Sequence, residues 1–335
     1  MPLHELSSRW LLPAWRGRVG AWWRWALDRA LCLRPARRLA RRVLLPRALR
    51  RPRHVALEVT AACNARCIMC PRHGMGRPMR PMDVGLFKKV VDECAAMGVE
   101  EIALNGYGEI FTLRPECYRE YIAYLRARAA RIRVIVNTNA HAMDEAAARF
   151  LVESGVHTVH TDVDGATALT FERIREHLSL ARVEANILRL VAIRGELRAQ
   201  RPTVRVGMIA MPDNRHEVPA FLEKWRGKVD VVAIDGLHNR VPGIDPAEWP
   251  GQARRCFEPW DRLNIWADGK AVLCCEDWNG THVVGDARVQ PVGEVWDGEP
   301  MRAARRAHDS GAGRSIALCA GCNAWRRGPT WWSQE

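Results

Sequence analysis

Three closely spaced cysteines form the first candidate metal site of the chain. Cys63, Cys67 and Cys70 follow the pattern C-x3-C-x2-C. A structural zinc site takes four ligands, which three thiolates cannot supply. Three thiolates can instead bind three irons of a 4Fe–4S cluster and leave the fourth iron open to a small molecule. Three unrelated cysteines or a partial zinc knuckle are the alternative interpretations.

Four further cysteines form a second candidate metal set. Cys256 and Cys274 frame the pattern C-x12-G-x4-C, and Cys319 and Cys322 form C-x2-C. Four thiolates can close a zinc site or ligate every iron of a complete iron–sulfur cluster, and the spacing is compatible with both. The adjacent Cys275 is a spare thiol. It could donate a hydrogen atom to a substrate radical, although a buried thiol beside a cluster is more often inert.

The elements that position these cysteines alternate between strand and helix. Apolar β-type segments are followed by segments with helical periodicity, about six times in succession. Such alternation predicts parallel strands with right-handed crossovers, hence an α/β fold with a partial (β/α)6 barrel. The predicted strands are 54–60, 99–109, 132–140, 156–165, 203–211 and 229–237, and the predicted helices are 83–98, 114–130, 144–155, 170–197 and 215–227.

Several polar residues fall where these predicted strands end. In barrels of this kind the reacting groups lie on the loops that follow the carboxyl ends of the strands. The first cysteine loop, Glu109, Asn137 and Asp162 all occupy such positions. The sequence therefore predicts that these groups meet at one end of the barrel.

The composition changes after Arg240. The following stretch is rich in proline, glycine and tryptophan, and residues 264–274 give a strand–turn–strand signal. We therefore expect three parts: a helical arm over 1–50, a barrel over 51–244 and a small second domain over 245–335.

The predicted arm carries most of the positive charge. Residues 1–50 hold twelve arginines against Glu5 and Asp28, in a chain of net charge +13. A basic amphipathic helix over 19–33, with several tryptophans, suits a peripheral membrane contact. An arm packed on the barrel is the alternative, and nucleic acid is not expected because no base-reading motif is present. Without a signal peptide or an apolar run of membrane-spanning length, we expect a cytoplasmic protein, with membrane association through this arm as an option.

The motif "CNARCIMC" resembles the signature of the radical S-adenosylmethionine (SAM) enzymes. The resemblance implies a 4Fe–4S cluster whose open iron binds the amino and carboxylate groups of SAM. It also implies a set of SAM contacts. These are Met69 near the adenine, Tyr107, Gly108 and Glu109 of "NGYGE" at the amino group, Asn137 of the "NTN" strand end, Thr161 or Asp162 at the ribose, and Met208 or Ile209 along the adenine pocket.

The second cysteine set is similar to the SPASM domain, or its short form, twitch. This resemblance implies one auxiliary 4Fe–4S cluster ligated by Cys256, Cys274, Cys319 and Cys322, since no cysteine follows Cys322. The tail is similar to that of the 2-deoxy-scyllo-inosamine dehydrogenases, in its cysteine spacing, in "C-x-E-D" at 274–277 and in "VGEVW" at 292–296. Arg240 lies roughly where those enzymes have an arginine near the substrate.

These resemblances imply oxidation of a hydroxylated small molecule, a sugar or an aminocyclitol. A 5′-deoxyadenosyl radical would remove hydrogen from the carbon that bears the hydroxyl, a base held by Arg240 or Glu276 would take the proton, and the auxiliary cluster would accept the electron. Glu276 and Arg240 could equally form a structural ion pair. An external one-electron reductant such as flavodoxin or ferredoxin is expected as a partner.

Other functions fit the same motifs. A radical epimerase would use Cys275 to return hydrogen to the opposite face of the substrate. Modification of a ribosomal peptide is common among auxiliary-cluster enzymes. A non-enzymatic iron–sulfur electron carrier or a zinc-stabilised binding module would not explain polar residues at the strand ends of a barrel.

Overall fold

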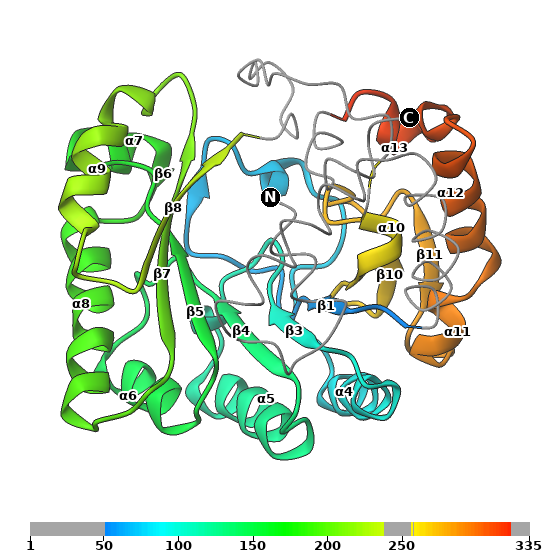
Figure 1. Cartoon of the computed structure of the whole chain (residues 1–335), viewed down its shortest axis with the longest axis horizontal. Helices are drawn as coiled ribbons and strands as arrows, with labels where there is room; N and C mark the ends of the chain where they lie inside the picture. Colours follow the sequence, from blue (N-terminus) through cyan, green and yellow to red (C-terminus); the bar gives the residue numbers. More distant parts are fainter. Residues whose placement is uncertain (1–50, 238–255, 257, 323–335) are drawn as a thin grey trace, which may run out of the picture.

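The computed structural model describes residues 51–237, 256 and 258–322, and its main feature is a curved parallel sheet (Figure 1). Six strands follow one another in the sheet in chain order, and each pairs in parallel with the next. They are β1 (His54–Leu57), β3 (Glu101–Leu104), β4 (Arg133–Asn137), β5 (Thr158–Asp162), β7 (Thr203–Ala210) and β8 (Val231–Gly236). The predicted partial barrel is confirmed.

Helices between these strands cover the outer face of the sheet (Figure 1). They are α4 (Val84–Met97), α5 (Pro115–Arg128), α6 (Glu145–Glu153), α7 (Ala168–Ile174), α8 (Leu180–Glu196) and α9 (Val218–Trp225). Asp83 caps α4 by accepting a hydrogen bond from the Leu86 amide at 2.9 Å. Gly98 ends the same helix with a φ of 71°, the conformation that favours glycine at this position.

The helix predicted over 170–197 is interrupted. The chain leaves α7 at Arg175, forms the two-residue strand β6 (Arg175–Glu176), and enters α8 only at Leu180. β6 pairs antiparallel with β2 (Arg66–Cys67), which belongs to the first cysteine loop. Local helical propensity therefore gives way to a tertiary contact that ties the cysteine loop to the barrel.

The C-terminal part extends the same sheet. It contains α10 (Glu258–Asp261), β9 (Arg262–Ile265), β10 (Lys270–Val272), β11 (Val283–Asp286), α11 (Val292–Trp296), α12 (Glu299–Asp309) and α13 (Ala317–Ala320). β9 pairs in parallel with β1, and β10 and β11 continue antiparallel, so the sheet has nine strands. The strand–turn–strand signal is confirmed as the β9–β10 hairpin. Short 3-10 helices occupy Pro71–Gly74, Ile110–Thr112, Arg215–Glu217 and Gly313–Ser315.

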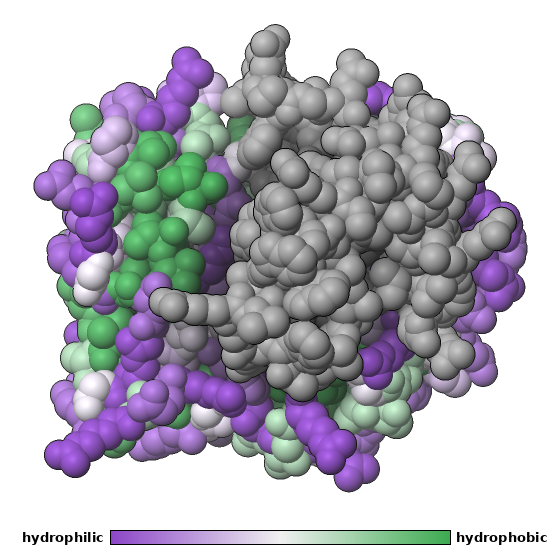
Figure 2. Space-filling model, in the orientation of Figure 1, coloured by the Kyte–Doolittle hydropathy of each residue, from purple (hydrophilic) through white to green (hydrophobic). Residues whose placement is uncertain are grey.

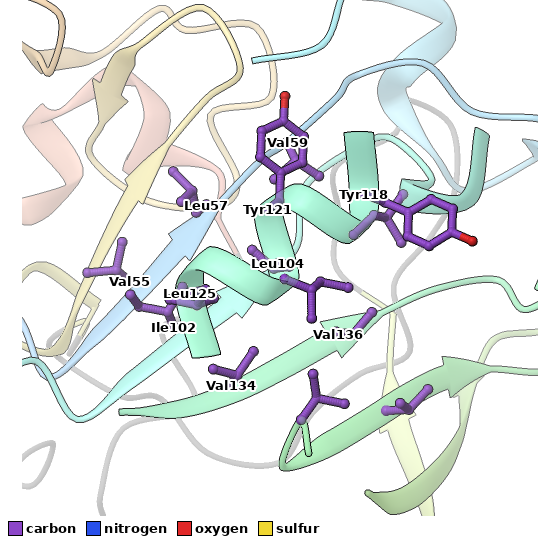
Figure 3. Packing of buried hydrophobic residues seen from close by; sticks show 14 of the residues in the cluster. Val55, Leu57, Val59, Ile102, Leu104, Tyr118, Tyr121, Leu125, Val134 and Val136 are labelled. Carbon is purple, nitrogen blue, oxygen red and sulfur yellow. The ribbon is translucent and has the colours of Figure 1, made fainter. Parts of the chain in front are cut away.

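The core between sheet and helices decides which strand residues face the barrel interior. Alternate residues of the strands, such as Val55, Ile102 and Val134, pack towards α5, whose Tyr121 and Leu125 are fully buried (Figure 3). Because successive strand residues point to opposite faces, the residues between them face the interior. This alternation places Asn137, Asp162 and Ile209 inside the barrel.

The last strand, β8, forms one edge of the sheet, because the partial barrel does not close on itself. Figure 2 shows hydrophobic residues on the side of the molecule where Figure 1 shows β8 and α9. Val231 and Ile234 of β8 are exposed. Among the described residues, no helix is long and apolar enough to cross a membrane. The basic arm over 1–50, Arg240 and the predicted boundary between 244 and 245 all lie outside the described residues.

Candidate functional site: two cysteine loops on one sheet

The first cysteine loop starts where β1 ends, at the carboxyl edge of the parallel strands. Cys63 precedes β2, Cys67 lies in β2, and Cys70 precedes the 3-10 helix at Pro71–Gly74. The antiparallel pairing places Cys67 opposite Arg175, and the Ile68 amide donates to the Ile174 carbonyl at 2.9 Å. The predicted position of this loop, after the first strand and facing the barrel end, is confirmed.

The three thiols of this loop are half-buried and lie near one another. Burial raises the pKa of the Cys67 thiol to about 12, while the positive charge of Arg175 opposes that rise. Burial also raises the pKa of Cys63, and negative charge on Cys70 raises the pKa of both Cys63 and Cys67. The three sulfurs are therefore near enough to repel one another as thiolates, which fits a cationic iron cluster that takes three thiolate ligands.

No group of three His, Cys, Asp or Glu side chains in the described part of the chain is arranged to hold a single metal ion. The ligands of a four-iron cluster each bind a different iron, so they lie farther apart than the ligands of one ion.

An apolar wall adjoins the same loop. Met69, Ile174, Met211 and Leu237 form a buried cluster, and Cys67, Ile68 and Ile209 pack against it. Met208 is 0% exposed and belongs to the main core on the helix side of β7. The structure thus places Ile209 beside Met69, and the prediction that Met208 lines the same pocket is wrong because the alternation of the strand points it the other way.

Glu109 is a buried hub that joins the loops after β3 and β4. It is 2% exposed, and its carboxylate accepts hydrogen bonds from the Thr138 hydroxyl at 2.7 Å and the backbone amides of Asn139 at 2.6 Å and Phe111 at 3.1 Å. Burial raises its pKa, and these hydrogen bonds oppose the rise. The Asn139 side chain then lies 3.8 Å from the Cys63 sulfur. Glu109 therefore orients a neighbour of the cysteine loop, and its predicted contact with SAM stays a prediction.

Gly108 and Tyr107 lie against the two cysteine loops. A Cβ atom on Gly108 would lie 2.1 Å from the Thr60 carbonyl oxygen, so only glycine allows this close approach. The Tyr107 hydroxyl points the other way and donates to the Cys275 carbonyl at 2.5 Å.

The strands β5, β7 and β8 carry an array of charged side chains on the face towards the barrel interior. His160 Nε2 lies 2.9 Å from Asp162 Oδ1, and Arg205 lies 3.4 Å from His160 Nδ1 and 3.1 Å from Asp235 Oδ2. Burial opposes ionisation of Asp162, but the contact with His160 and the charges of Arg175 and Arg205 hold its pKa below the ordinary value.

The two residues predicted for the ribose contact point to different faces of β5. Thr161 is 2% exposed and faces the helices, whereas the Asp162 side chain is 31% exposed and faces the interior. The geometry therefore favours Asp162 over Thr161 as a residue that a ligand can reach. Asn137, at the end of β4, also faces the interior.

The second cysteine set gathers from three segments around β9 and β10. Cys256 precedes α10, Cys274 follows β10, and Cys319 and Cys322 lie in and just after α13. Burial raises the pKa of Cys256 and Cys274 and raises that of Cys319 to about 12. Negative charge on Cys319 and Cys322 also raises the pKa of Cys256, and negative charge on Cys256 also raises the pKa of Cys274. The four thiols, two of them buried and two half-buried, are gathered in one region and fit a fully ligated cluster.

Cys275 and Glu276 lie on the loop after β10. The Cys275 sulfur is 3.9 Å from Glu276 Oε1. Arg240 lies outside the described residues, so the structure does not test the predicted pairing of Arg240 with Glu276.

A buried ion pair that the sequence analysis missed joins the two cysteine loops. Glu58 accepts hydrogen bonds from both terminal nitrogens of Arg77, with 2.7 Å between Oε2 and Nη2, and from the Tyr107 amide at 3.0 Å. Arg77 Nε also donates to the Trp278 carbonyl at 2.7 Å, beyond Cys274. The sequence contained a signal for this pair: Glu58 is the acidic residue of the apolar segment "HVALEVT", and a buried carboxylate requires a charged partner.

Arg175 and Asp164 form a second missed pair. Arg175 Nε donates to Asp164 Oδ2 at 2.7 Å, and Asp164 also accepts the Ile209 amide at 2.8 Å. This ion pair holds the Arg175 side chain next to the first cysteine loop, where Arg175 pairs with Cys67. Arg175 stands in a segment with helical periodicity, so no local pattern distinguishes it from a surface arginine.

Two family models match the chain. The model of the radical SAM superfamily matches residues 57–224, and the SPASM model, an iron–sulfur cluster-binding domain, matches residues 256–323. These assignments confirm the expected cofactors: SAM with its 4Fe–4S cluster, and an iron–sulfur cluster in the C-terminal domain.

Relatives of known activity match part of the chain. A GTP 3′,8-cyclase of Chlorobaculum tepidum is 29% identical over 185 residues, which cover 55% of this chain and 53% of that protein. An AdoMet-dependent heme synthase of Methanosarcina barkeri is 31% identical over 125 residues, or 37% and 34% of the two chains. The chain thus spans about half or less of the length of these relatives.

Solved structures with bound SAM share the fold. BtrN in complex with AdoMet and 2-DOIA has a TM-score of 0.57 at 19% identity, covering 81% of this chain and 93% of BtrN. SuiB of Streptococcus suis, bound to S-adenosylmethionine, has a TM-score of 0.64 at 12% identity, covering 90% and 80%. Together with a superfamily match that extends over half of its length, this likeness leads to one conclusion: the chain belongs to the radical SAM superfamily.

Proposed function

We propose that this radical SAM enzyme oxidises an alcohol of a hydroxylated small molecule, a sugar or an aminocyclitol, to a ketone. The tail resembles that of 2-deoxy-scyllo-inosamine dehydrogenases, and the fold is shared with BtrN bound to AdoMet and 2-DOIA. The oxidation removes a hydrogen atom, a proton and an electron from the substrate. The bound SAM and clusters supply the hydrogen-atom and electron chemistry.

In this proposal the protein holds its cofactors through the residues that the sequence singled out. Cys63, Cys67 and Cys70 ligate the SAM-binding cluster, and the second set ligates one auxiliary 4Fe–4S cluster. Met69 and Ile209 contact the adenine, Asp162 the ribose, and the loop of Gly108 and Glu109 the amino group. Asn137 lies beside them at the end of β4.

The interior array provides partners for substrate hydroxyl groups. Next to Asp162, which this proposal assigns to the ribose, the side chains of His160, Arg205 and Asp235 place hydrogen-bond donors and acceptors side by side within the barrel. A substrate with several hydroxyls can exchange hydrogen bonds with these side chains, whereas an apolar substrate would displace water from them without replacing its hydrogen bonds. Glu276, or a base held by Arg240, takes the proton of the reacting hydroxyl.

One observation carries the proposal: Cys256 and Cys274 flank the β9–β10 hairpin of the sheet that continues from the barrel through β1, and Cys319 and Cys322 are near enough to raise the pKa of Cys256. A cluster ligated by four cysteines has no iron open to substrate, so it suits electron transfer. The close link between the two loops favours an exchange of electrons with a substrate held between them.

The test uses the full chain, reconstituted with iron and sulfide without oxygen. Two clusters give about eight irons per chain, and Cys274→Ala leaves about four. With SAM and a reductant, such as reduced flavodoxin or ferredoxin, the protein forms 5′-deoxyadenosine. With 2-deoxy-scyllo-inosamine as the probe, we expect a ketone in an amount that follows the 5′-deoxyadenosine. A set of polyols and aminocyclitols that yields no carbonyl product would overturn the proposal.

Radical epimerisation is the second candidate, favoured by the partly exposed Cys275 beside Cys274. An epimerase acquires solvent deuterium at the inverted carbon, and Cys275→Ala abolishes that product while a dehydrogenase retains its activity. Peptide modification is a further candidate, since anSMEcpe with bound AdoMet and a peptide shares the fold at a TM-score of 0.59. Peptide substrates then replace polyols in the same assay.

A further inference from the structure

A buried histidine faces one of the cysteines of the second set. His308, in the last turn of α12, has its Nε2 atom 3.6 Å from the sulfur of Cys319 in α13. The two residues are 1% and 7% exposed, so water does not compete for this contact.

The surrounding structure fixes the orientation of the imidazole. Trp260 of α10 meets the His308 ring edge-on, with 6.2 Å between ring centroids and an interplanar angle of 71°. The chain turns back directly after α12, where the Gly311 amide donates to the His308 carbonyl at 3.3 Å. α13 then begins, and the Cys319 amide donates to the Ile316 carbonyl at 2.8 Å. His308 is thus held between the segments that carry Cys256 and Cys319.

The chemistry of the sulfur decides which ring nitrogen carries hydrogen. A cysteine that ligates iron is a thiolate, which accepts hydrogen bonds and cannot donate one. The facing Nε2 must therefore be the protonated nitrogen.

We propose that His308 is a positioning residue that donates an N–H···S hydrogen bond to Cys319 and thereby raises the reduction potential of the auxiliary cluster. Reduction adds negative charge to the cluster, and part of that charge resides on the thiolate sulfurs. A donor to sulfur stabilises the reduced form more than the oxidised form, so the cluster accepts an electron more readily.

This inference rests on the proposed function only for its consequence, which is that the cluster accepts an electron from substrate. The hydrogen bond and the potential concern the chain itself. They can be measured without substrate and without turnover.

The experiment is a redox titration followed by electron paramagnetic resonance on the reconstituted full chain. The auxiliary cluster gives the signal that added SAM leaves unchanged, because SAM binds only the open iron of the other cluster. His308→Leu removes the donor, and His308→Gln keeps an N–H near the position of Nε2. His308→Met provides a second apolar variant should the leucine protein fail to fold.

We expect His308→Leu or His308→Met to keep about eight irons and to lower the potential of the auxiliary cluster. A change of about tenfold in the ratio of reduced to oxidised cluster at fixed potential, equal to ~59 mV for one electron, is the expected size. His308→Gln should stay near the parent value, and the potential of the SAM-binding cluster should not move.

Equal potentials in all variants would overturn the inference and leave the proposed function standing. Loss of four irons in His308→Leu, His308→Met and His308→Gln alike would also overturn it, since packing or direct ligation would then be the role of the ring. If the potential of the auxiliary cluster shifts as expected but the protein makes no ketone, the proposed function is contradicted and this inference stands.

Discussion

The hydroxyl group of Tyr107 donates a hydrogen bond to the carbonyl oxygen of Cys275 at 2.5 Å. Tyr107 belongs to the loop after β3, beside the first cysteine set, and Cys275 follows a member of the second set. The Tyr107 ring packs edge-on against Trp266, with 5.7 Å between centroids, and Cys70 packs against the same apolar cluster. One side chain thus connects the surroundings of the two predicted clusters.

Tyr107→Phe should remove this connection and keep the ring. We expect the free energy of unfolding to fall by about 1 kcal/mol, the usual contribution of one hydrogen bond, and the amides around Cys275 to exchange hydrogen faster. Urea unfolding and hydrogen exchange measure these effects. Tyr124→Phe, which removes a surface contact with Asp92, is the matched control and should change neither as much. Equal behaviour of the two variants would show that the Tyr107 hydroxyl does not hold the second loop.

Glu58→Gln should be the more damaging change. It leaves the Arg77 guanidinium buried without its anion, and breaking one side of a buried pair costs about 3–5 kcal/mol. The double variant Glu58→Gln/Arg77→Met should be less destabilised than the sum of the single variants, because no lone charge stays buried.

Urea unfolding of the three proteins measures these free energies. Glu120→Gln, in the exposed pair with Lys88, serves as control and should leave the free energy of unfolding nearly unchanged. Additive losses in the double variant would count against a coupled pair.

Asp162→Ala should weaken SAM binding. A hydrogen bond to a charged group contributes enough to change an affinity by roughly tenfold, and the Asp162 side chain is open to the interior. Titration calorimetry on the oxygen-protected protein measures the dissociation constant. Thr161→Val, which removes the hydroxyl and keeps the branched shape, is the matched control, because Thr161 faces the helices and the variant should leave the affinity unchanged. The reverse order of effects would assign the ribose contact to Thr161.

The stability of the protein should fall in mild acid because of His157. Burial, followed by the charges of Arg201, Arg126 and Arg133, lowers its pKa from 6.5 to about 4. The neutral ring accepts a hydrogen bond from the Val134 amide at its Nδ1 atom, at 3.0 Å. A lowered histidine pKa means that the unfolded chain binds the proton first. The stabilisation is therefore complete above pH 6.5 and is lost as the pH falls towards 4.

Unfolding free energies measured with urea at several pH values between 7 and 4 test this dependence. His157→Asn keeps an acceptor for the Val134 amide but does not titrate, so its curve should be flatter over this interval. Burial raises the pKa of Glu217, but hydrogen bonds from Thr167 and Thr170 outweigh it and lower the pKa to about 2. The contribution of Glu217 to the free energy of unfolding is therefore lost only as the pH falls below about 4.5. Parallel curves for parent and variant above that pH would exclude His157 as the cause.

Much of the site could be predicted because its signals are local. The spacing of Cys63, Cys67 and Cys70 limits the metal chemistry through the number of ligands, and the alternation of strands and helices predicts the barrel through simple periodicity. The loops after the strands then meet at one end of the sheet, because parallel strands share a direction.

Other features depended on contacts between distant segments. Thr161 and Asp162 can both bind a ribose hydroxyl, and Met208 and Ile209 can both line an apolar pocket, so residue type alone did not separate the members of either pair. The packing of the helices decided which residue of each pair faces the interior.

The sequence by itself determined which side chains can ligate iron and the order in which the barrel is built. The tertiary structure decided that β9 pairs with β1, that Glu58 meets Arg77, and that His308 faces Cys319. These pairings join separate elements of the chain, and the free energy of burial that selects them exists only once the elements have packed together.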